Sequence, residues 1–299
     1  MPIFDVTILT DSRFVNPPSP GEYVRNVLSE DKFVKTALEN KGLSVTRKDW
    51  ADPDFDWTDT GVVLFRTTWD YFYRLKEFKN WLINTYPKTT FINSSKLIDW
   101  NIDKHYLVSL SQKNIRIVPT RFVPRGTAIS LEDLHALTGW NYTVIKPTIG
   151  GGGRHTYSIG VENIPVISRK LKNVMKEEDF MLQPFQHSIT EHGEWSYVFF
   201  GNQFSHSVLK KAREGDFRVQ DDFGGTVHSY QPTQKEIDFA LSVVHACPEL
   251  PVYSRVDILI DNDGELAVSE LELIEPELWF RLKPEAANLL ADEVIKKVE

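Results

Sequence analysis

The chain has 299 residues, of which 41% are hydrophobic and 25% are charged, enough apolar material for about two domains. The 42 acidic residues outnumber the 34 basic ones, which disfavours wholesale binding of nucleic acid or of an anionic membrane, because both need a basic face. The single cysteine, Cys247, excludes an intramolecular disulfide and a thiolate zinc site. No apolar run approaches the ~18 residues that span a bilayer, so we expect a cytoplasmic protein.

The first hundred residues predict alternating strands and helices. Buried strands are expected at 5–10, 43–48 and 61–66, and amphipathic helices at 20–41 and 70–86, where apolar side chains recur every three or four residues. Strands that alternate with helices indicate a parallel sheet with crossover helices.

After a predicted helix at 101–113, strands dominate the chain. They are expected at 115–118, 121–123, 143–146, 180–184, 195–200, 203–209, 253–260 and 265–273. Turn residues at 201–202 and 262–264 separate neighbouring strands, as in antiparallel hairpins. The predicted fold class is therefore α/β in the N-terminal region followed by α+β.

A predicted strand that ends in Lys146 and Pro147 runs into four consecutive glycines, residues 150–153. Glycines let the backbone approach an anion closely, and a lysine supplies a point charge for phosphate. No Gly-Lys-Ser/Thr follows, so this is not a Walker-type loop. The alternative for the glycine run alone is a flexible surface loop.

A predicted hairpin carries Arg255 and Asp257 on one strand and Glu270 and Glu272 on the next. Residues i and i+2 of a strand share a face, so three carboxylates and one guanidinium converge. Carboxylates at that density repel one another unless a cation lies between them, and oxygen-only ligands suit Mg²⁺. The alternative is a solvent-facing edge strand of alternating Glu and Leu.

Two further groups of residues are candidates for substrate contacts. Arg66 ends the third predicted strand, where parallel sheets bind ligands, and Trp69 and Asp70 follow it at once. They supply an aromatic wall and an acceptor for an amino group, or else they pack at the start of a helix. Lys210 and Arg218 belong to a run of four cations that either contacts phosphate or carboxylate or forms a solvated face.

The order of these motifs resembles the ATP-grasp superfamily of carboxylate–amine ligases. The segments 66–71, 206–210 and 270–276 are most similar to the cycloserine synthetase family, and 214–218 looks like the glutathione synthetase branch. The resemblance implies the ATP-grasp fold, with an N-terminal parallel-sheet (pre-ATP-grasp) domain and two α+β lobes that clamp ATP. The implied domain bounds are 1–100, 101–183 and 184–299, and the resemblance suggests a homodimer.

The resemblance also implies a role for each matching residue. The nucleotide contacts would be Lys104, Lys146, Gly150, Gly151, Gly152, Gly153, Gln183, Pro184, Phe185 and Glu194. The ligands of Mg²⁺ or Mn²⁺ would be Asp257, Glu270 and Glu272, and the catalytic residues Arg255, Arg218 and Lys210. The substrate contacts would be Arg66, Trp69, Asp70 and Arg218.

These roles predict an ATP- and Mg²⁺-dependent ligase for a small, amino-acid-like substrate. The substrate carboxylate would become an acyl phosphate that an amine then attacks, within one molecule in the manner of cycloserine synthetase or between two. The alternatives are an ATP-grasp phosphotransferase, a glutamate or peptide ligase that acts on a peptide, and a non-catalytic nucleotide-binding module.

Overall fold

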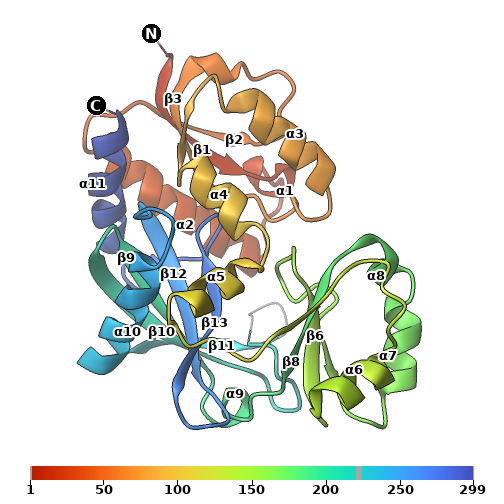
Figure 1. Cartoon of the computed structure of the whole chain (residues 1–299). Coiled ribbons are helices and arrows are strands. Elements are labelled where there is room, and N and C mark those ends of the chain that lie inside the picture. The colour runs from red at the N-terminus through yellow and green to blue at the C-terminus, as the bar shows by residue number, and fades with distance from the viewer. Residues whose placement is uncertain (1, 220–223, 299) are drawn as a thin grey trace.

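The computed structural model describes residues 2–219 and 224–298, and these residues are built around three β-sheets (Figure 1). The N-terminal sheet is entirely parallel and has the order β2-β1-β3-β4, which confirms the predicted parallel arrangement. Its strands are β1 (Phe4–Thr10), β2 (Val45–Asp49), β3 (Thr60–Thr67) and β4 (Thr90–Ile92). The continuous apolar run at 62–65 is buried on both faces, as is usual for a central parallel strand.

Helices cover the two faces of this sheet. They are α1 (Ser12–Val15), α2 (Glu22–Glu39), α3 (Leu75–Thr85) and α4 (Ser95–Asn101), with a short 3-10 helix, η1 (Trp57–Asp59). The helix predicted from residue 70 begins only at Leu75. Residues 68–74 instead form consecutive turns, in which the amide of Tyr71 donates to the carbonyl of Thr68 and that of Tyr73 to Asp70.

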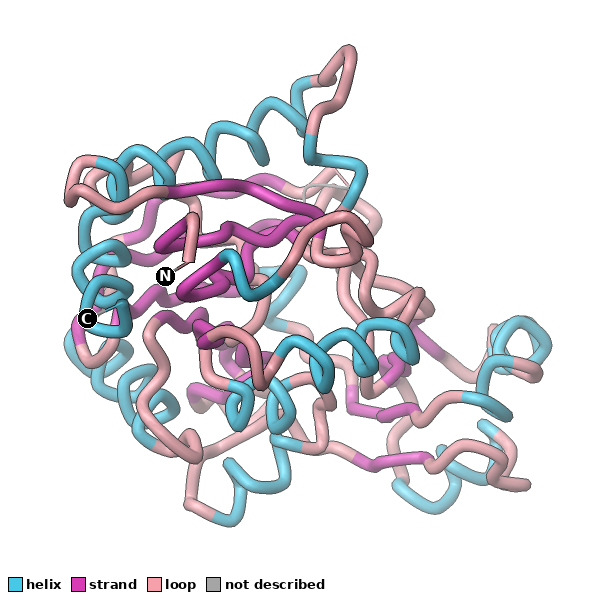
Figure 2. Tube along the Cα trace, turned by 90° about the horizontal axis from the view of Figure 1, so that it is seen from above, coloured by secondary structure: helices cyan, strands magenta, loops and turns pink. Residues whose placement is uncertain are grey.

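A small sheet with the order β5-β8-β6-β7 is antiparallel throughout. Its strands are β5 (Arg121–Val123), β6 (Thr143–Pro147), β7 (Tyr157–Ile159) and β8 (Phe180–Pro184). The helices α6 (Leu131–Thr138), α7 (Ile164–Leu171) and α8 (Val174–Glu177) accompany it, and buried side chains of α6 and α7 share one apolar core with the sheet. In Figure 2 this sheet and its helices stand apart from the rest of the molecule, at the lower right.

The large sheet has the order β11-β10-β9-β12-β13 and is also antiparallel. Its strands are β9 (Glu194–Phe200), β10 (Gln203–Lys211), β11 (Thr226–Tyr230), β12 (Tyr253–Ile260) and β13 (Leu266–Glu272). Both predicted hairpins are present, one between β9 and β10 and one between β12 and β13. The strand predicted at 115–118 is not formed, because Ile117 makes only an isolated bridge to Val268.

Both faces of the large sheet are buried. Helices α5 (Tyr106–Gln112) and α10 (Gln234–His245) pack on one face, while α11 (Ala286–Val298) contacts strands β9 and β10 and also helix α2. A short helix, α9 (Ser188–Glu191), connects β8 to β9. No helix among the described residues is both long and apolar enough to cross a membrane.

Candidate functional site

A cavity of about 540 Å³ takes its wall from all three sheets and their connecting loops. The small sheet contributes the end of β6 and the glycine-rich loop that follows it. The large sheet contributes the charged ends of β9, β10, β12 and β13, and the N-terminal sheet contributes the segments after β1 and β3. The carboxyl ends of parallel strands are where such sheets bind ligands, so this position suits an active site.

The register of the β12–β13 hairpin brings its charged residues opposite one another. Arg255 lies opposite Glu272, and Asp257 lies opposite Glu270. All four side chains line the cavity, so the predicted placement of one guanidinium and three carboxylates on one wall is confirmed.

Asp257 is the most heavily bonded of these carboxylates. It accepts two hydrogen bonds of 2.9 Å from the Arg255 guanidinium and one of 2.6 Å from the Ser196 hydroxyl. Burial alone raises the pKa of Asp257, but Arg255 and Lys210 outweigh burial and bring its pKa well below the usual value. Asp257 is therefore ionised at neutral pH.

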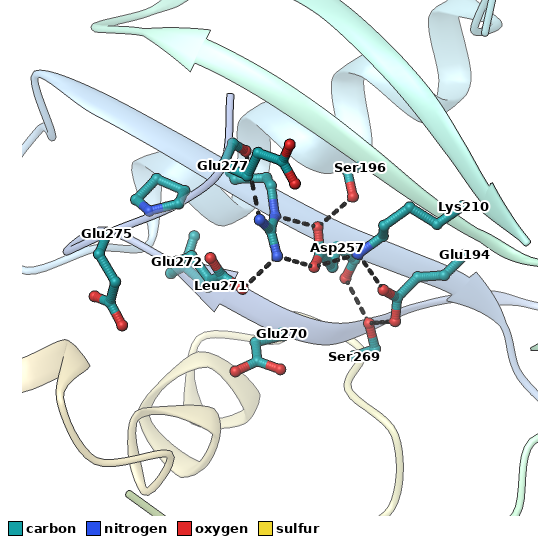
Figure 3. A network of polar contacts seen from close by, with 12 residues as sticks. Glu194, Ser196, Lys210, Asp257, Ser269, Glu270, Leu271, Glu272, Glu275 and Glu277 are labelled. Atoms are coloured by element: carbon teal, nitrogen blue, oxygen red, sulfur yellow. Dashed lines mark hydrogen bonds and ion pairs between the residues drawn. The ribbon is translucent and has the colours of Figure 1, made fainter. Parts of the chain in front are cut away.

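Lys210 links two strands of the same wall. Its ammonium is 2.8 Å from Asp257 on β12 and 2.5 Å from Glu194 on β9, and Ser269 donates to the other oxygen of Glu194 over 2.7 Å. Figure 3 shows these contacts, with the carboxylate of Glu270 pointing away from them. Burial lowers the pKa of Lys210, but the two carboxylates outweigh burial and raise it, so the lysine is charged.

Glu270 faces the opposite wall, where two lysines meet it. Lys104, just before α5, is 3.1 Å from Glu270 and also donates over 2.7 Å to the carbonyl of Gly150. Lys146, on β6, is 3.8 Å from the other oxygen of Glu270. Burial raises the pKa of Glu270, but the two lysines outweigh burial and lower it.

For two other carboxylates in the cavity, neighbouring cations do not outweigh the effect of burial on the pKa. Burial raises the pKa of Glu272 to about 8, although Arg255 opposes this, and the neighbouring carboxylates Asp257 and Glu270 add to it. Burial also raises the pKa of Glu275 to about 7, and its carboxyl is bonded to the Tyr71 hydroxyl. Both carboxyls therefore hold a proton more readily than a glutamate in water does.

The far end of the cavity is apolar and lies beside the linker from β8. Gln183, Pro184 and Phe185 all line it, and the Phe185 ring lies 4.5 Å from the Tyr142 ring and 5.9 Å from the Phe217 ring. Gln183 is fixed by a 2.9 Å bond to the hydroxyl of Thr120. Such a slot between aromatic rings suits a flat heterocycle.

The N-terminal wall contains residues that sequence reasoning missed. Arg13 and Phe14 follow β1, Tyr23 starts α2, and all three line the cavity together with the predicted Trp69. Phe14 lies edge-on to Trp69 at 5.7 Å, and Tyr23 is 6.4 Å from the same ring. Their position directly after the first parallel strand is the signal that could have found them.

Two predicted substrate residues do not line the cavity. Arg66 is 1% exposed; its guanidinium donates over 3.0 Å to the carbonyl of Pro276 and lies 5.6 Å from the Phe280 ring. Asp70 accepts from the indole of Trp50 and from Arg74. Arg66 is therefore part of the protein interior, and both carboxylate oxygens of Asp70 accept from protein donors.

Arg218 lines the cavity, as expected of a substrate contact. Two of its nitrogens donate to Asp216 over 3.1 and 2.7 Å, and this pairing, opposed by burial, lowers the pKa of Asp216 to about 2.

Within residues 2–219 and 224–298, no three carboxylate, imidazole or thiolate groups are gathered closely enough to form a metal site. The three predicted ligands are each turned toward cations instead: Asp257 and Glu272 toward Arg255, and Glu270 toward the two lysines.

Comparison with known proteins finds one matching family model and one similar protein sequence. Residues 6–93 match the family model of the N-terminal domain of D-cycloserine synthetase DcsG. The cycloserine biosynthesis protein DcsG of Streptomyces lavendulae is 28% identical over 281 residues, which cover 88% of this chain and 92% of that protein.

Solved structures extend the likeness over the whole chain. The crystal structure of D-cycloserine synthetase DcsG superposes with a TM-score of 0.86 at 24% identity, covering 98% of this chain and 99% of that one. D-alanine–D-alanine ligase from Bacillus anthracis, solved with ATP, has a TM-score of 0.65 at 12% identity and covers 99% of this chain and 97% of its own. An ATP-grasp RimK domain protein from Sphaerobacter thermophilus has a TM-score of 0.69 at 14% identity, with coverage of 97% and 99%.

The fold is that of ATP-grasp ligases, as the sequence predicted. The chain is similar to D-cycloserine synthetase in its N-terminal domain as well as in its overall fold.

Proposed function

We propose that the chain is an ATP- and Mg²⁺-dependent ligase that activates the carboxylate of a small, amino-acid-like molecule and joins it to nitrogen. The observation that carries this proposal is the register of the β12–β13 hairpin, which sets Arg255, Asp257, Glu270 and Glu272 on one wall. Lys104 and Lys146 face that wall, each within 3.8 Å of Glu270. A polyphosphate needs cations of this kind, and a divalent cation needs these carboxylates.

The donor set fits Mg²⁺ bound to a nucleotide. All three proposed ligands, Asp257, Glu270 and Glu272, present only oxygen atoms, which is the preference of Mg²⁺. Burial first, and then the neighbouring Asp257 and Glu270, raise the pKa of Glu272 to about 8. A divalent cation beside this carboxyl would favour its ionised form.

The two ends of the cavity would contact different parts of the nucleotide. The aromatic slot at Phe185 would hold the adenine against the backbone of Gln183 and Pro184, with Glu194 near the ribose. Lys104, Lys146 and the glycines 150–153 would hold the phosphates. Backbone amides of a glycine-rich loop and lysine ammonium groups both favour phosphate oxygens.

When bound, MgATP supplies the γ-phosphoryl group that turns a carboxylate into an acyl phosphate. Arg255 and Lys210 then stabilise charge on the transferred group, and Arg218 binds the substrate carboxylate. Positioning and charge neutralisation account for most of such a step. The glycine-rich loop excludes water, which otherwise hydrolyses the activated carboxyl.

The N-terminal wall would select the substrate. Trp69 lies there as predicted, and Phe14 and Tyr23 complete the aromatic surface. In place of Arg66 and Asp70, which do not line the cavity, we assign the polar contacts on this side to Arg13, Glu275 and Glu277, which do. Mixed charges of both signs suit a molecule that carries an amino and a carboxyl group.

Similarity to D-cycloserine synthetase favours closure of a ring within one molecule over joining of two. The domain bounds 1–100, 101–183 and 184–299, a homodimer, a cytoplasmic location and the use of Mn²⁺ stay predictions.

The test measures release of ADP and phosphate with MgATP against a panel of amino acids, their O-linked derivatives and small peptides. We expect one compound to stimulate equal release of both, with a new C–N bond in the product. A stable phosphorylated product would indicate a phosphotransferase, stimulation by a peptide would indicate a peptide ligase, and ATP binding without turnover would indicate a binding module.

A further inference from the structure

The turn that follows β3 reaches the glycine-rich loop of the small sheet. A Cβ atom built on Gly151 would lie 3.2 Å from Cε1 of the Phe72 ring, so this ring is pressed against the glycine backbone. The guanidinium carbon of Arg154 lies 5.6 Å from the centroid of the Tyr73 ring. Two consecutive aromatic residues of the N-terminal region therefore contact two positions of the loop.

The loop itself is fixed at its base and bare at its tip. Lys104 donates to the carbonyl of Gly150 over 2.7 Å, and Arg154 donates to Glu178 over 2.7 Å. Between these points, Gly152 and Gly153 have φ of 56° and 66°, a left-handed conformation that glycine adopts without strain. The tip has no side chains to hold it, so its position depends on what packs against it.

The turn is also tied to the substrate end of the cavity. The Trp69 indole donates over 2.9 Å to the carbonyl of Glu275, and the carboxyl of Glu275 contributes to the raised pKa of the Tyr71 hydroxyl, which burial raises first. The Phe72 ring lies 5.4 Å from the Tyr71 ring. The turn that carries Phe72 therefore contacts Glu275 on one side and Gly151 on the other.

Tyr73 has little to do with the N-terminal core, because it is 65% exposed. A ring that exposed buries too little apolar surface to matter for folding. Its contacts are the neighbouring Phe72 ring at 4.6 Å and the Arg154 guanidinium, and a guanidinium over an aromatic face is an attractive pair. The contact with Arg154 of the glycine-rich loop therefore explains the position of the Tyr73 ring better than packing within the N-terminal region does.

We infer that Phe72 and Tyr73 are positioning residues that hold the glycine-rich loop closed over the nucleotide phosphates. The inference rests on the proposed function for the phosphates, whereas the loop contacts are observed in the structure itself. Because the same turn is bonded to Glu275, substrate at that end and the closed loop stabilise each other. Loss of either ring lets the loop open and admits water to the activated carboxyl.

Limited proteolysis with trypsin tests the loop contacts directly. The Arg154 side chain is 11% exposed and paired with Glu178, so cleavage between Arg154 and His155 requires the loop to open. We expect Tyr73→Ala to speed this cleavage about two- to fivefold, the population change that a partly exposed cation–π pair supports. Phe72→Ala should speed it by more, because its ring contacts the backbone itself.

Three controls separate loop positioning from general damage. Tyr73→Phe keeps the ring and should be cleaved at the wild-type rate, and so should Ile83→Ala, which removes an exposed side chain of α3 far along the same domain. Thermal unfolding midpoints of Tyr73→Ala and wild type should agree. Cleavage at equal rates in wild type, Tyr73→Ala and Phe72→Ala would overturn the inference.

Calorimetric titration with Mg²⁺ and the non-hydrolysable analogue AMPPNP tests the proposed function separately. Wild type should bind the analogue, and the bound analogue should protect the Arg154–His155 bond less well in Tyr73→Ala than in wild type. Absence of binding to wild type would reject the nucleotide site, whereas binding with equal protection in both proteins would reject only the role of the two rings.

Discussion

The large-sheet wall and the N-terminal wall of the cavity differ in how their side chains are held. On the first, Asp257 alone has three protein partners, Ser196, Lys210 and Arg255, all within 2.9 Å. On the second, the contacts are mainly rings against rings, such as Phe14 and Tyr23 around Trp69 at 5.7 and 6.4 Å.

This difference suits the two tasks of the proposed ligase. Phosphoryl transfer needs charges that are fixed before the reaction, since fixed charges need not reorganise in the transition state. Substrate selection needs a surface whose shape fits the substrate. A few packed aromatic side chains can set that shape. The large-sheet wall should therefore respond to substitution with losses of stability and turnover, and the opposite walls with changes in binding.

The largest expected effect is on the stability of the large-sheet wall. Lys210→Met leaves Asp257 and Glu194 buried without their shared cation, and breaking a buried ion pair costs about 3–5 kcal/mol. Urea unfolding should show this loss. The neighbouring Lys211→Met changes an exposed lysine of the same strand and should stay within about 0.5 kcal/mol of wild type. Equal stability of both variants would contradict a structural role for Lys210.

The next effect is on turnover. Glu270→Gln keeps the shape of a proposed metal ligand but removes its charge, so kcat should fall by about a hundredfold or more, while the affinity for the adenine end persists. ADP release and calorimetry with AMPPNP measure the two quantities. Glu265→Gln, at an exposed position of the same hairpin, is the matched control. Undiminished ATP consumption by Glu270→Gln would remove Glu270 from the metal set.

A smaller effect is expected on the small-sheet side of the cavity. Lys146→Ala removes one charged donor to phosphate, and the dissociation constant of AMPPNP should rise about 10- to 100-fold. Lys172→Ala, an exposed lysine after α7, should bind like wild type. Calorimetry that shows equal affinity for all three proteins would exclude Lys146 from the phosphate contacts.

The smallest effect is on the pH dependence of stability. His206 is buried on β10, its ring bonded to the carbonyl of Leu278, and burial lowers its pKa to about 4. An unfolded histidine has a pKa near 6.5, so between pH 6.5 and about 4 the unfolded chain binds more protons. The contribution of His206 to stability is therefore complete above pH 6.5 and is lost as the pH falls through this window.

Urea unfolding at several pH values measures this contribution. His206→Gln should flatten the decline below pH 6.5 by on the order of 1–3 kcal/mol, whereas the exposed His228→Gln should keep the wild-type slope. Parallel slopes for wild type and His206→Gln would show that His206 does not titrate in this range.

The sequence by itself determined the parallel N-terminal sheet, the antiparallel sheets and the two hairpins of the large sheet. These follow from local signals: the period of apolar residues and the turn residues at 201–202 and 262–264. Alternation along each strand also places Arg255 with Asp257, and Glu270 with Glu272, on shared faces. The pairing of Arg255 with Glu272 and of Asp257 with Glu270 depends in addition on a register shift between Asp257 and Ile258, which no local pattern contains.

Only the tertiary structure decided which polar residues beside the sheet face the cavity. Arg66 ends a strand at the right edge, yet its guanidinium is bonded to Pro276, 210 positions along the chain. Phe72, expected on a regular helix, belongs instead to a turn and presses on Gly151. The period and spacing of residues are local properties of the sequence. The direction of a side chain at the end of a strand depends on its partners, and these partners are distant in the sequence. Only folding brings them near, so no local pattern predicts them.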